Sequence, residues 1–344
     1  MILTVTPNPA EDLTWHLAEL RPGETLRVPT GVSRAGGKGL NVARVLAAEG
    51  HDVLALTTAG GAAGTRLADD LERSGIPHRL VPVRGETRRS LALVDESSGE
   101  TTILNEHGAP LADAEADALL AEAARLGRRA DVVVISGSLP PGFGPDELAG
   151  LVAELVAAGA PVIVDTSGPG LLASARAGAT VLKPNRDELA EVTGHDDPVA
   201  GGRALLDAGA RLVLVSLGTE GLLVLSHADR SDGVRARLPR PLHGNATGAG
   251  DAAVAAIAAA VATTPSLVSD PGREGVAARA ALARRATAWS ASAVLMPVAG
   301  ALSPDHVRLE AEVVVTGDHE ASAADQANTE RAQQAPATDP RTTA

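Results

Sequence analysis

The 344-residue sequence contains no cysteine, which excludes disulfide bonds, thiolate metal sites and thiol nucleophiles. Aromatic residues make up only 1% of the chain, whereas hydrophobic residues reach 44%, so the core must be built from Ala, Val, Leu and Ile. Basic residues are also in the minority, and the formal net charge of -13 argues against a basic surface. Nucleic acids and anionic membranes require a basic patch, so we expect neither as a partner.

No charged-then-apolar leader opens the sequence, and the apolar stretch 252–262 is too short and too weakly hydrophobic to span a bilayer. We therefore expect a cytoplasmic protein. The length favours one large α/β domain with an accessory piece. Beyond about residue 316 the chain loses hydrophobic periodicity and becomes rich in Ala, Thr, Gln, Asp and Glu. We expect a folded domain over 1–315 and a disordered tail over 316–344.

Lysine is scarce: among 30 lysine and arginine residues only Lys38 and Lys183 are lysines. Both lie in candidate motifs, a glycine-rich segment at 36–39 and Lys-Pro-Asn at 183–185. A compact, flexible ammonium group suits a tight phosphate site better than a planar guanidinium does. The two lysines are therefore candidate phosphate ligands. The alternative is that these two lysines have no special role and remain by chance in a sequence that otherwise uses arginine.

A pattern recurs along the sequence: a short apolar run ends in polar or glycine-rich residues, and a helical stretch follows. This rhythm predicts a doubly wound, mostly parallel α/β sheet with helices on both faces. The expected strands are 2–6, 53–57, 78–83, 131–136, 161–164, 180–182 and 213–216. Two excursions interrupt the rhythm, and we expect them to pair into a small sheet that stands off the main one. Their expected strands are 13–17, 25–29, 88–95 and 101–105.

The segment 244–251 is a glycine-rich turn that ends in a carboxylate and opens an apolar helix. Gly248 and Gly250 let the backbone approach a ligand closely, and the first N–H groups of the helix are unpaired donors. Together they favour an anion site, most naturally for phosphate. Asp251 would then take a proton from a hydroxyl that attacks phosphorus. On this turn alone, Asp251 could equally be a simple N-cap.

Neither glycine-rich segment fits a common nucleotide-binding motif well. The dinucleotide-binding pattern fits 248–253 loosely, but no buried strand precedes it and no strand ending in an acidic residue follows about twenty residues later. The segment around Lys38 is not a Walker loop, because Gly39 stands where Ser or Thr is needed. A close backbone approach to a sugar or phosphate still accounts for three glycines beside Asn41.

Further carboxylates follow expected strands, at the sheet edge where open α/β proteins bind ligands. Asp12 comes soon after the strand 2–6, and Asp165 directly after 161–164. Asn185 and Glu188 share one face of the first turn of a helix. They could hold waters around a magnesium ion that belongs mainly to ATP, or they could form a capping box.

In this order the motifs resemble those of the PfkB-type sugar kinases with a ribokinase-like fold, over about residues 2–312. The branch with 1-phosphofructokinase, tagatose-6-phosphate kinase and the minor 6-phosphofructokinase is the most similar. The motifs are Asn-Pro-Ala-Glu-Asp at 8–12, Gly-Gly-Lys-Gly-Leu-Asn-Val-Ala-Arg at 36–44, Thr-Arg at 87–88, Ser-Gly-Ser-Leu-Pro-Pro-Gly at 136–142, Val-Asp-Thr-Ser-Gly at 164–168, Lys-Pro-Asn-Arg-Asp-Glu at 183–188, Ser-Leu-Gly at 216–218 and Gly-Ala-Gly-Asp at 248–251.

The resemblance implies phosphoryl transfer from ATP and Mg²⁺ to a ketohexose phosphate, as in 1-phosphofructokinase, giving fructose 1,6-bisphosphate. Asp251 would be the general base, with the anion hole at Gly248, Ala249 and Gly250. The sugar hydroxyls would be held by Asp12, Gly37 and Asn41. The phosphate already on the substrate would be bound by Arg88, Ser138 and Lys38.

On the nucleotide side, the resemblance assigns ATP contacts to Lys183, Asn185, Ser216, Gly218, Gly221 and Thr247. It assigns the magnesium ion to Glu188 and Asp165. The excursions, over about 11–34 and 86–107, become a lid that pairs between subunits in a homodimer.

Three residues depart from the family pattern: Glu11 replaces a hydrophobic residue, Ser90 replaces an Asn and Ala252 replaces a Ser. The first two lie on the sugar side and leave the sugar open, with tagatose 6-phosphate and fructose 6-phosphate as alternatives. A kinase for a free sugar or nucleoside is disfavoured by Arg88, since a guanidinium in the lid suits a substrate phosphate. A non-catalytic sugar-phosphate sensor would have no need of Asp251.

Overall fold

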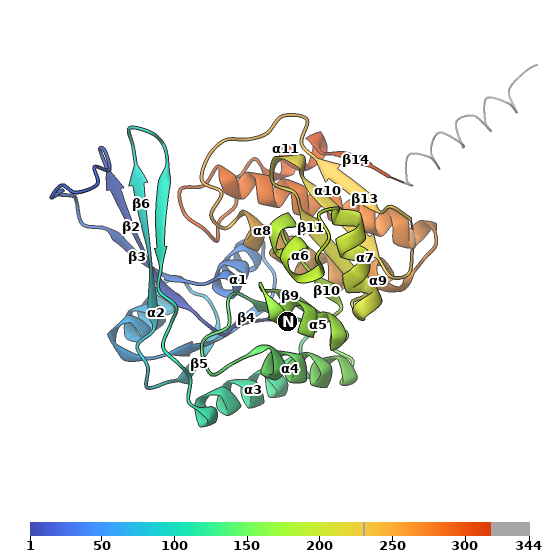
Figure 1. Cartoon of the computed structure of the whole chain (residues 1–344), viewed down its shortest axis with the longest axis horizontal. Coiled ribbons are helices and arrows are strands. Elements are labelled where there is room, and N and C mark those ends of the chain that lie inside the picture. Colours follow the sequence, from blue (N-terminus) through green and yellow to red (C-terminus); the bar gives the residue numbers. More distant parts are fainter. Residues whose placement is uncertain (230, 318–344) are drawn as a thin grey trace, which may run out of the picture.

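The computed structural model describes residues 1–229 and 231–317. Within these ranges the chain forms one ten-stranded sheet and one four-stranded sheet (Figure 1). The expected tail lies, from residue 318 onward, outside the described residues.

The large sheet is the doubly wound sheet that the sequence predicts, with strand order β14-β13-β12-β11-β10-β9-β8-β1-β4-β5. Its strands are β1 (Ile2–Thr6), β4 (Val53–Ala59), β5 (His78–Pro82), β8 (Val132–Ser136), β9 (Val162–Asp165), β10 (Val181–Leu182), β11 (Leu212–Ser216), β12 (Leu222–Ser226), β13 (Val234–Arg237) and β14 (Val314–Thr316). Seven neighbouring strands of this sheet are parallel, namely β5, β4, β1, β8, β9, β10 and β11. The strands β12, β13 and β14 add an antiparallel edge. The carboxyl ends of the parallel strands therefore meet at one edge, where such sheets bind ligands.

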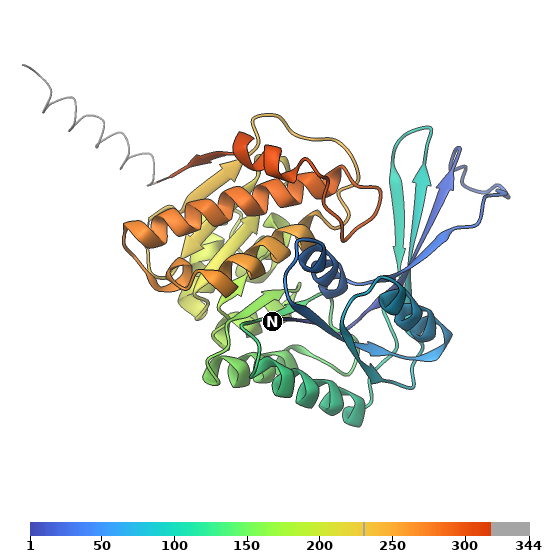
Figure 2. The same ribbon diagram turned by 180° about the vertical axis from the view of Figure 1, so that it is seen from behind.

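Helices cover both faces of this sheet, and each face has its own apolar core. One core joins the sheet to α1 (Lys38–Ala48), α2 (Gly61–Arg73), α8 (Ala249–Thr263) and α10 (Arg273–Val294). Figure 2 shows α8 and α10 running across this face. The other core joins it to α3 (Asp113–Gly127), α4 (Pro145–Ala157), α5 (Pro169–Arg176), α6 (Arg186–Thr193) and α7 (Pro198–Ala208). The shorter α9 (Ser266–Ser269) and α11 (His306–Glu312) lie beside α10. No helix in the described ranges is both long enough and apolar enough to cross a bilayer.

The small sheet has the order β3-β2-β6-β7 and stands away from the main sheet (Figure 1). Its strands are β2 (Ala10–Leu17), β3 (Val32–Gly36), β6 (Arg88–Asp95) and β7 (Thr101–Asn105). The pairing of the two excursions is thus confirmed, but the expected strand at 25–29 is wrong. That stretch contains Pro29, which cannot donate to a ladder, and the chain pairs through β3 instead. The sequence of β3 is only weakly apolar, so it gave no clear signal of a strand.

A helix was also expected after the strand at 213–216, and there the structure differs. The chain makes a short 3₁₀ turn, η1 (Gly218–Glu220), and returns as the antiparallel strand β12. Gly221 makes this return possible: its φ is +91°, and a Cβ there would lie 2.0 Å from the Ala236 carbonyl oxygen. Only glycine fits such a backbone without displacing the neighbouring strand.

An ion pair between Glu11 and Arg66 connects the base of the small sheet to the main domain. Glu11, on β2, accepts two hydrogen bonds from Arg66 of α2, at 2.6 and 2.7 Å, and one from Ser33 of β3 at 2.8 Å. The Arg66 guanidinium, more than any other group, lowers the pKa of the Glu11 carboxyl. Glu11, the departure from the family pattern, is therefore a buried carboxylate whose ion pair with the exposed Arg66 connects two strands of the small sheet to α2.

Candidate active site

Asp251 lies in the first turn of α8, which begins at Ala249 with Gly248 as its N-cap. The interpretation of Asp251 as the N-cap is therefore wrong. Gly248 has φ +85°, and a Cβ there would lie 2.8 Å from that of Ala299, so a side chain would not fit. The Asp251 carboxylate is buried and accepts a hydrogen bond of 2.8 Å from the amide of Asn41, on α1. This bond fixes the orientation of the carboxylate at the amino end of α8.

The surroundings of Asp251 raise the pKa of its carboxyl to about 6. Burial is the main cause and the charge of Asp165 adds to it, while Lys38, the Asn41 hydrogen bond and Lys183 act in the opposite direction. A carboxylate with this pKa is ionised at neutral pH and still basic enough to accept a proton in a reaction.

Asp165 brings the two lysines of the chain together. It ends β9, and its carboxylate is within 3.5 Å of Lys38 Nζ and 3.3 Å of Lys183 Nζ. The hydroxyl of Ser136, at the end of β8, donates to the same carboxylate at 3.2 Å. A Cβ added to Gly250 would lie 3.5 Å from Lys183 Nζ, so this ammonium group lies against the first turn of α8. The convergence of both lysines on one carboxylate favours a shared function over chance survival.

The residues predicted for the sugar side gather at the base of the small sheet. Asp12, on β2, has its pKa raised to about 6, chiefly by burial, while Arg88 of β6 acts against the rise. Gly36 packs on the Asp12 carboxylate so closely that a Cβ would lie 2.0 Å from Asp12 Cγ. Gly37, with φ +116°, is the N-cap of α1. Asp12, Gly37 and Asn41 thus come from neighbouring ends of β2 and α1.

Asn8, for which no role was predicted, joins Arg88 and Ser138, two of the residues predicted for the substrate phosphate. The third, Lys38, lies at Asp165. The Asn8 amide donates to Ser138 Oγ at 3.0 Å and to the His107 carbonyl at 3.1 Å. The backbone carbonyl of Asn8 accepts a hydrogen bond from Arg88 Nε at 3.2 Å. A polar residue between two prolines at the end of a buried strand was the available signal, since such a segment leaves the sheet at the ligand-binding edge.

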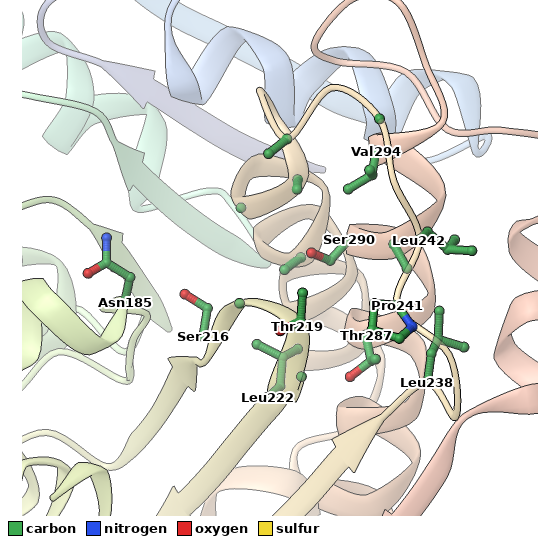
Figure 3. A pocket seen from close by; sticks show the side chains of 18 of the residues that line it. Asn185, Ser216, Thr219, Leu222, Leu238, Pro241, Leu242, Thr287, Ser290 and Val294 are labelled. Atoms are coloured by element: carbon green, nitrogen blue, oxygen red, sulfur yellow. The ribbon is translucent and has the colours of Figure 1, made fainter. Parts of the chain in front are cut away.

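A cavity of about 460 Å³ opens beyond the end of β11, next to the first turn of α8 (Figure 3). Of the residues predicted for the nucleotide and the anion hole, those lining it are Asn185, Ser216, Gly218, Gly221, Ala249 and Gly250. Thr247 is exposed, and Lys183 lies deeper, at Asp165; neither is among the lining residues.

The opposite wall of this cavity was not predicted. Figure 3 shows Leu238, Leu242 and Val294 facing Ser216 and Leu222 across it. These residues come from the loop after β13 and from α10, whose inward face only the fold identifies. Apolar walls with a few polar groups are typical of a site for a small organic ligand.

Asn185 and Glu188 form the capping box of α6. Asn185 Oδ1 accepts from the Glu188 backbone N–H at 2.8 Å, and Glu188 Oε2 accepts from that of Asn185 at 2.9 Å. Within the described ranges no group of three or more His, Cys, Asp or Glu residues could hold a metal ion.

Several known proteins are similar to this chain in sequence and in fold. Residues 10–304 match the model of the pfkB family of carbohydrate kinases. The 1-phosphofructokinase of Xanthomonas campestris pv. campestris is 39% identical over 325 residues, which span 92% of this chain and 98% of that protein. Phosphofructokinase-2 from Escherichia coli, in complex with fructose-6-phosphate, superposes with a TM-score of 0.79 at 29% identity, over 90% of this chain and 98% of that one.

A more distant neighbour shows the fold alone. The ribokinase of Arabidopsis thaliana, complexed with ribose and ATP, is 21% identical and superposes with a TM-score of 0.66 over 90% of this chain and 98% of that one. The ribokinase-like fold expected from the motifs is thus confirmed. The match to the family model covers most of the chain, and the chain therefore belongs to the pfkB family of carbohydrate kinases.

Proposed function

We propose that this kinase transfers the γ-phosphoryl group of ATP to fructose 1-phosphate and releases fructose 1,6-bisphosphate. The family and its relatives support an ATP-dependent sugar-phosphate kinase, and the 1-phosphofructokinase relative favours fructose 1-phosphate. The observation that carries the proposal is the position of Asp251. This buried carboxylate sits at the amino end of α8, whose first turn lines the 460 Å³ cavity, and Asn41 joins it to the sugar side.

In the proposed reaction, Asp251 accepts the proton of the acceptor hydroxyl as that oxygen attacks the γ-phosphorus. The bond between this phosphorus and the β–γ bridging oxygen breaks, and ADP leaves with that oxygen. The backbone N–H groups of Gly248, Ala249 and Gly250 stabilise the charge on the transferring phosphoryl oxygens, helped by the positive end of the helix dipole. Lys183 is close enough to Gly250 to contact the same oxygens. Positioning and electrostatics then account for most of the rate enhancement, as is usual for phosphoryl transfer.

On the acceptor side, Asp12 and Asn41 hold sugar hydroxyls beside Gly37. Arg88 and Ser138, kept in place by Asn8, bind the phosphate that the substrate already carries, with Lys38 nearby. A guanidinium is well suited to this, since it donates two parallel hydrogen bonds to phosphate.

Magnesium enters the proposal as the partner of ATP. The Asn185 amide, at the cavity wall, and the Glu188 carboxylate are hard oxygen donors that fit water-mediated contacts to such an ion. When bound, magnesium neutralises charge on the β- and γ-phosphates. The Thr247 contact to ATP stays part of the proposal, through its position next to Gly248. Because ATP and sugar phosphates are metabolites of the cytoplasm, we also propose that location.

A coupled ADP-release assay tests the proposed function. Wild-type protein with MgATP is assayed against fructose 1-phosphate, fructose 6-phosphate, tagatose 6-phosphate, fructose and ribose. We expect the highest kcat/KM with fructose 1-phosphate. Preference for either 6-phosphate would change the named substrate, whereas turnover of free sugars alone would contradict a substrate phosphate. Binding of sugar phosphates without any turnover would favour a sensor.

Replacing Arg88 with Ala should lower kcat/KM for the sugar phosphate by about 10- to 100-fold, the usual cost of losing a hydrogen bond to a charged group. With fructose, which lacks the phosphate, the same variant should lose much less. Arg89→Ala is the matched control, because Arg89 is the next residue of β6 and lies 3.7 Å from Glu11. Equal losses on fructose and fructose 1-phosphate would contradict the assignment of Arg88.

The pH profile of kcat/KM should have an acid limb near pH 6. The pKa of the Asp251 carboxyl and that of Asp12 are both raised to about 6. Below that pH each is protonated, and a protonated Asp251 cannot accept the hydroxyl proton, so the rate falls as the pH falls. Asp12→Asn leaves only Asp251 to titrate and should retain the limb at reduced activity. A limb near pH 4 would contradict the raised pKa of Asp251.

We also propose that the small sheet is a lid and pairs with its copy in a homodimer. β7 is exposed along its whole length, and Ile103, Leu104 and Val32 expose 42%, 52% and 60% of their surface. Ile103→Lys should shift the protein from dimer to monomer in analytical ultracentrifugation. Val307→Lys, which changes an exposed residue of α11, is the control. An unchanged dimer, or a wild-type monomer, would contradict pairing through the lid.

A further inference from the structure

We propose that Asp165 is a positioning residue that fixes the ammonium groups of Lys38 and Lys183 on either side of the transferring phosphoryl group, and that it is not a magnesium ligand. The inference deepens the proposed function and rests on it. It changes the role that the resemblance implies for Asp165.

The placement of Asp165 leaves it little freedom. It ends β9 in the middle of the main sheet, and its side chain is 1% exposed. Its two carboxylate oxygens face different cations: Oδ2 is 3.5 Å from Lys38 Nζ, and Oδ1 is 3.3 Å from Lys183 Nζ. The Ser136 hydroxyl, itself buried, donates to Oδ2 and fixes the orientation of the carboxylate.

The two lysines approach this carboxylate from opposite halves of the site. Lys38 is the first residue of α1, next to Gly37 on the sugar side, and its side chain is 41% exposed. Lys183 follows β10, is buried, and reaches Gly250 in the turn that lines the nucleotide cavity. A phosphoryl group that moves from ATP to the sugar therefore passes both ammonium groups.

Two ammonium groups held this close repel each other unless an anion lies between them. Lysine has a long, flexible stem, so without Asp165 the more exposed Lys38 would swing into solvent. Each ammonium group has three donors, and the contact with Asp165 leaves others for phosphate oxygens. Asp165, Lys38 and Lys183 together carry one net positive charge, which balances the negative charge of Asp251 and so reduces the repulsion of an arriving phosphate.

The same geometry argues against magnesium at Asp165. Both carboxylate oxygens already face an ammonium group, and a divalent cation there would meet two positive charges. Glu188, by contrast, uses its carboxylate only for the capping box among the hydrogen bonds of the described residues. Glu188→Gln is therefore the matched control for a role in metal binding.

The test compares Asp165→Asn with Glu188→Gln and wild type. Asparagine keeps the shape and can still accept from Ser136, but it removes the charge that holds the lysines. We expect kcat to fall by about 10²-fold, as when one preorganised donor is lost, with a smaller change in KM for ATP. The Mg²⁺ concentration for half-maximal rate should stay as in wild type for Asp165→Asn and rise for Glu188→Gln.

A pH readout separates positioning from a purely structural role. The charged groups facing Asp251 are Lys38 on α1, Lys183 after β10, Asp165 on β9 and Asp12 on β2. Removing the negative charge of Asp165 should lower the pKa of Asp251, so the acid limb should move to lower pH. Lys38→Met, which removes a positive charge, should move it to higher pH.

A binding measurement keeps this test independent of turnover. Calorimetry of ATP binding, with and without Mg²⁺, should give the same ratio of affinities for Asp165→Asn and wild type. If the single variant does not fold, the Lys38→Met/Asp165→Asn pair, which removes one charge of each sign, replaces it. A folded Asp165→Asn with wild-type kcat, or a loss of Mg²⁺ dependence in ATP binding, would overturn this inference alone. A wild type inactive on all sugar phosphates would instead overturn the proposed function.

Discussion

Asp251→Asn should lower kcat by about 10²- to 10⁴-fold, the usual contribution of a positioned general base. The amide has the shape of the carboxylate, but it cannot accept the proton of the acceptor hydroxyl. Affinity for ATP should change little, because the cavity walls and the backbone N–H groups of α8 remain. Steady-state kinetics with fructose 1-phosphate and calorimetry with ATP measure the two quantities.

Asp187→Asn is the control for this experiment. Asp187 also lies in the first turn of a helix on the nucleotide side, α6, but it is exposed. Its replacement should leave kcat almost unchanged. If Asp251→Asn retained a kcat close to that of wild type, Asp251 would not be the base.

Asp70→Ala should lower the free energy of unfolding by about 3–5 kcal/mol, because it leaves a buried guanidinium without its counter-charge. Asp70, on α2, forms an ion pair with Arg44 of α1, which is 5% exposed, and accepts a hydrogen bond of 2.9 Å from the backbone N–H of Ala35 on β3. One carboxylate thus joins two helices to the edge strand of the small sheet. Urea denaturation followed by the fluorescence of the two tryptophans measures the loss.

Asp69→Ala provides the matched comparison, since Asp69 is the preceding residue of α2 and is exposed. Surface substitutions of this kind usually change stability by less than about 0.5 kcal/mol. Equal effects of the two substitutions would contradict a stabilising role for the Asp70–Arg44 pair.

Much of the main sheet could be predicted from the sequence, because its central strands are buried on both faces and appear as continuous apolar runs. The run at 132–136 is entirely buried in β8, and the matching run at 162–165 pairs with it in parallel. The antiparallel edge of the sheet was harder to predict. Whether a helix or a return strand follows β11 depends on the contact between Gly221 and Ala236, which no local pattern reveals.

The site could be predicted where its residues follow strands or open helices, since the edge of a parallel sheet collects them. Asp251, Lys38 and Lys183 belong to this class. Residues whose contacts are with distant parts of the sequence could not be predicted in this way. Asn8 stands out only through its hydrogen bonds to Ser138 and His107, which are about a hundred or more positions away. Leu238 and Val294 line the cavity only because α10 packs beside it.

The capping box at Asn185 and Glu188 is a structural role, and a functional role for the same residues stays a prediction. The hydrogen bonds that close the first turn of α6 join the Glu188 carboxylate to Asn185, which lines the cavity beside β11. Sequence could place both residues on one helix face, but only the fold relates that face to the cavity.

Phosphoryl transfer to C6 of fructose 1-phosphate can be followed by ³¹P NMR of the product formed with MgATP, with wild type and Asp251→Asn in parallel. We expect ADP and fructose 1,6-bisphosphate, with a new phosphate signal at C6, from the wild type and almost none from the variant. Inorganic phosphate without a bisphosphate, or equal product from both proteins, would contradict it.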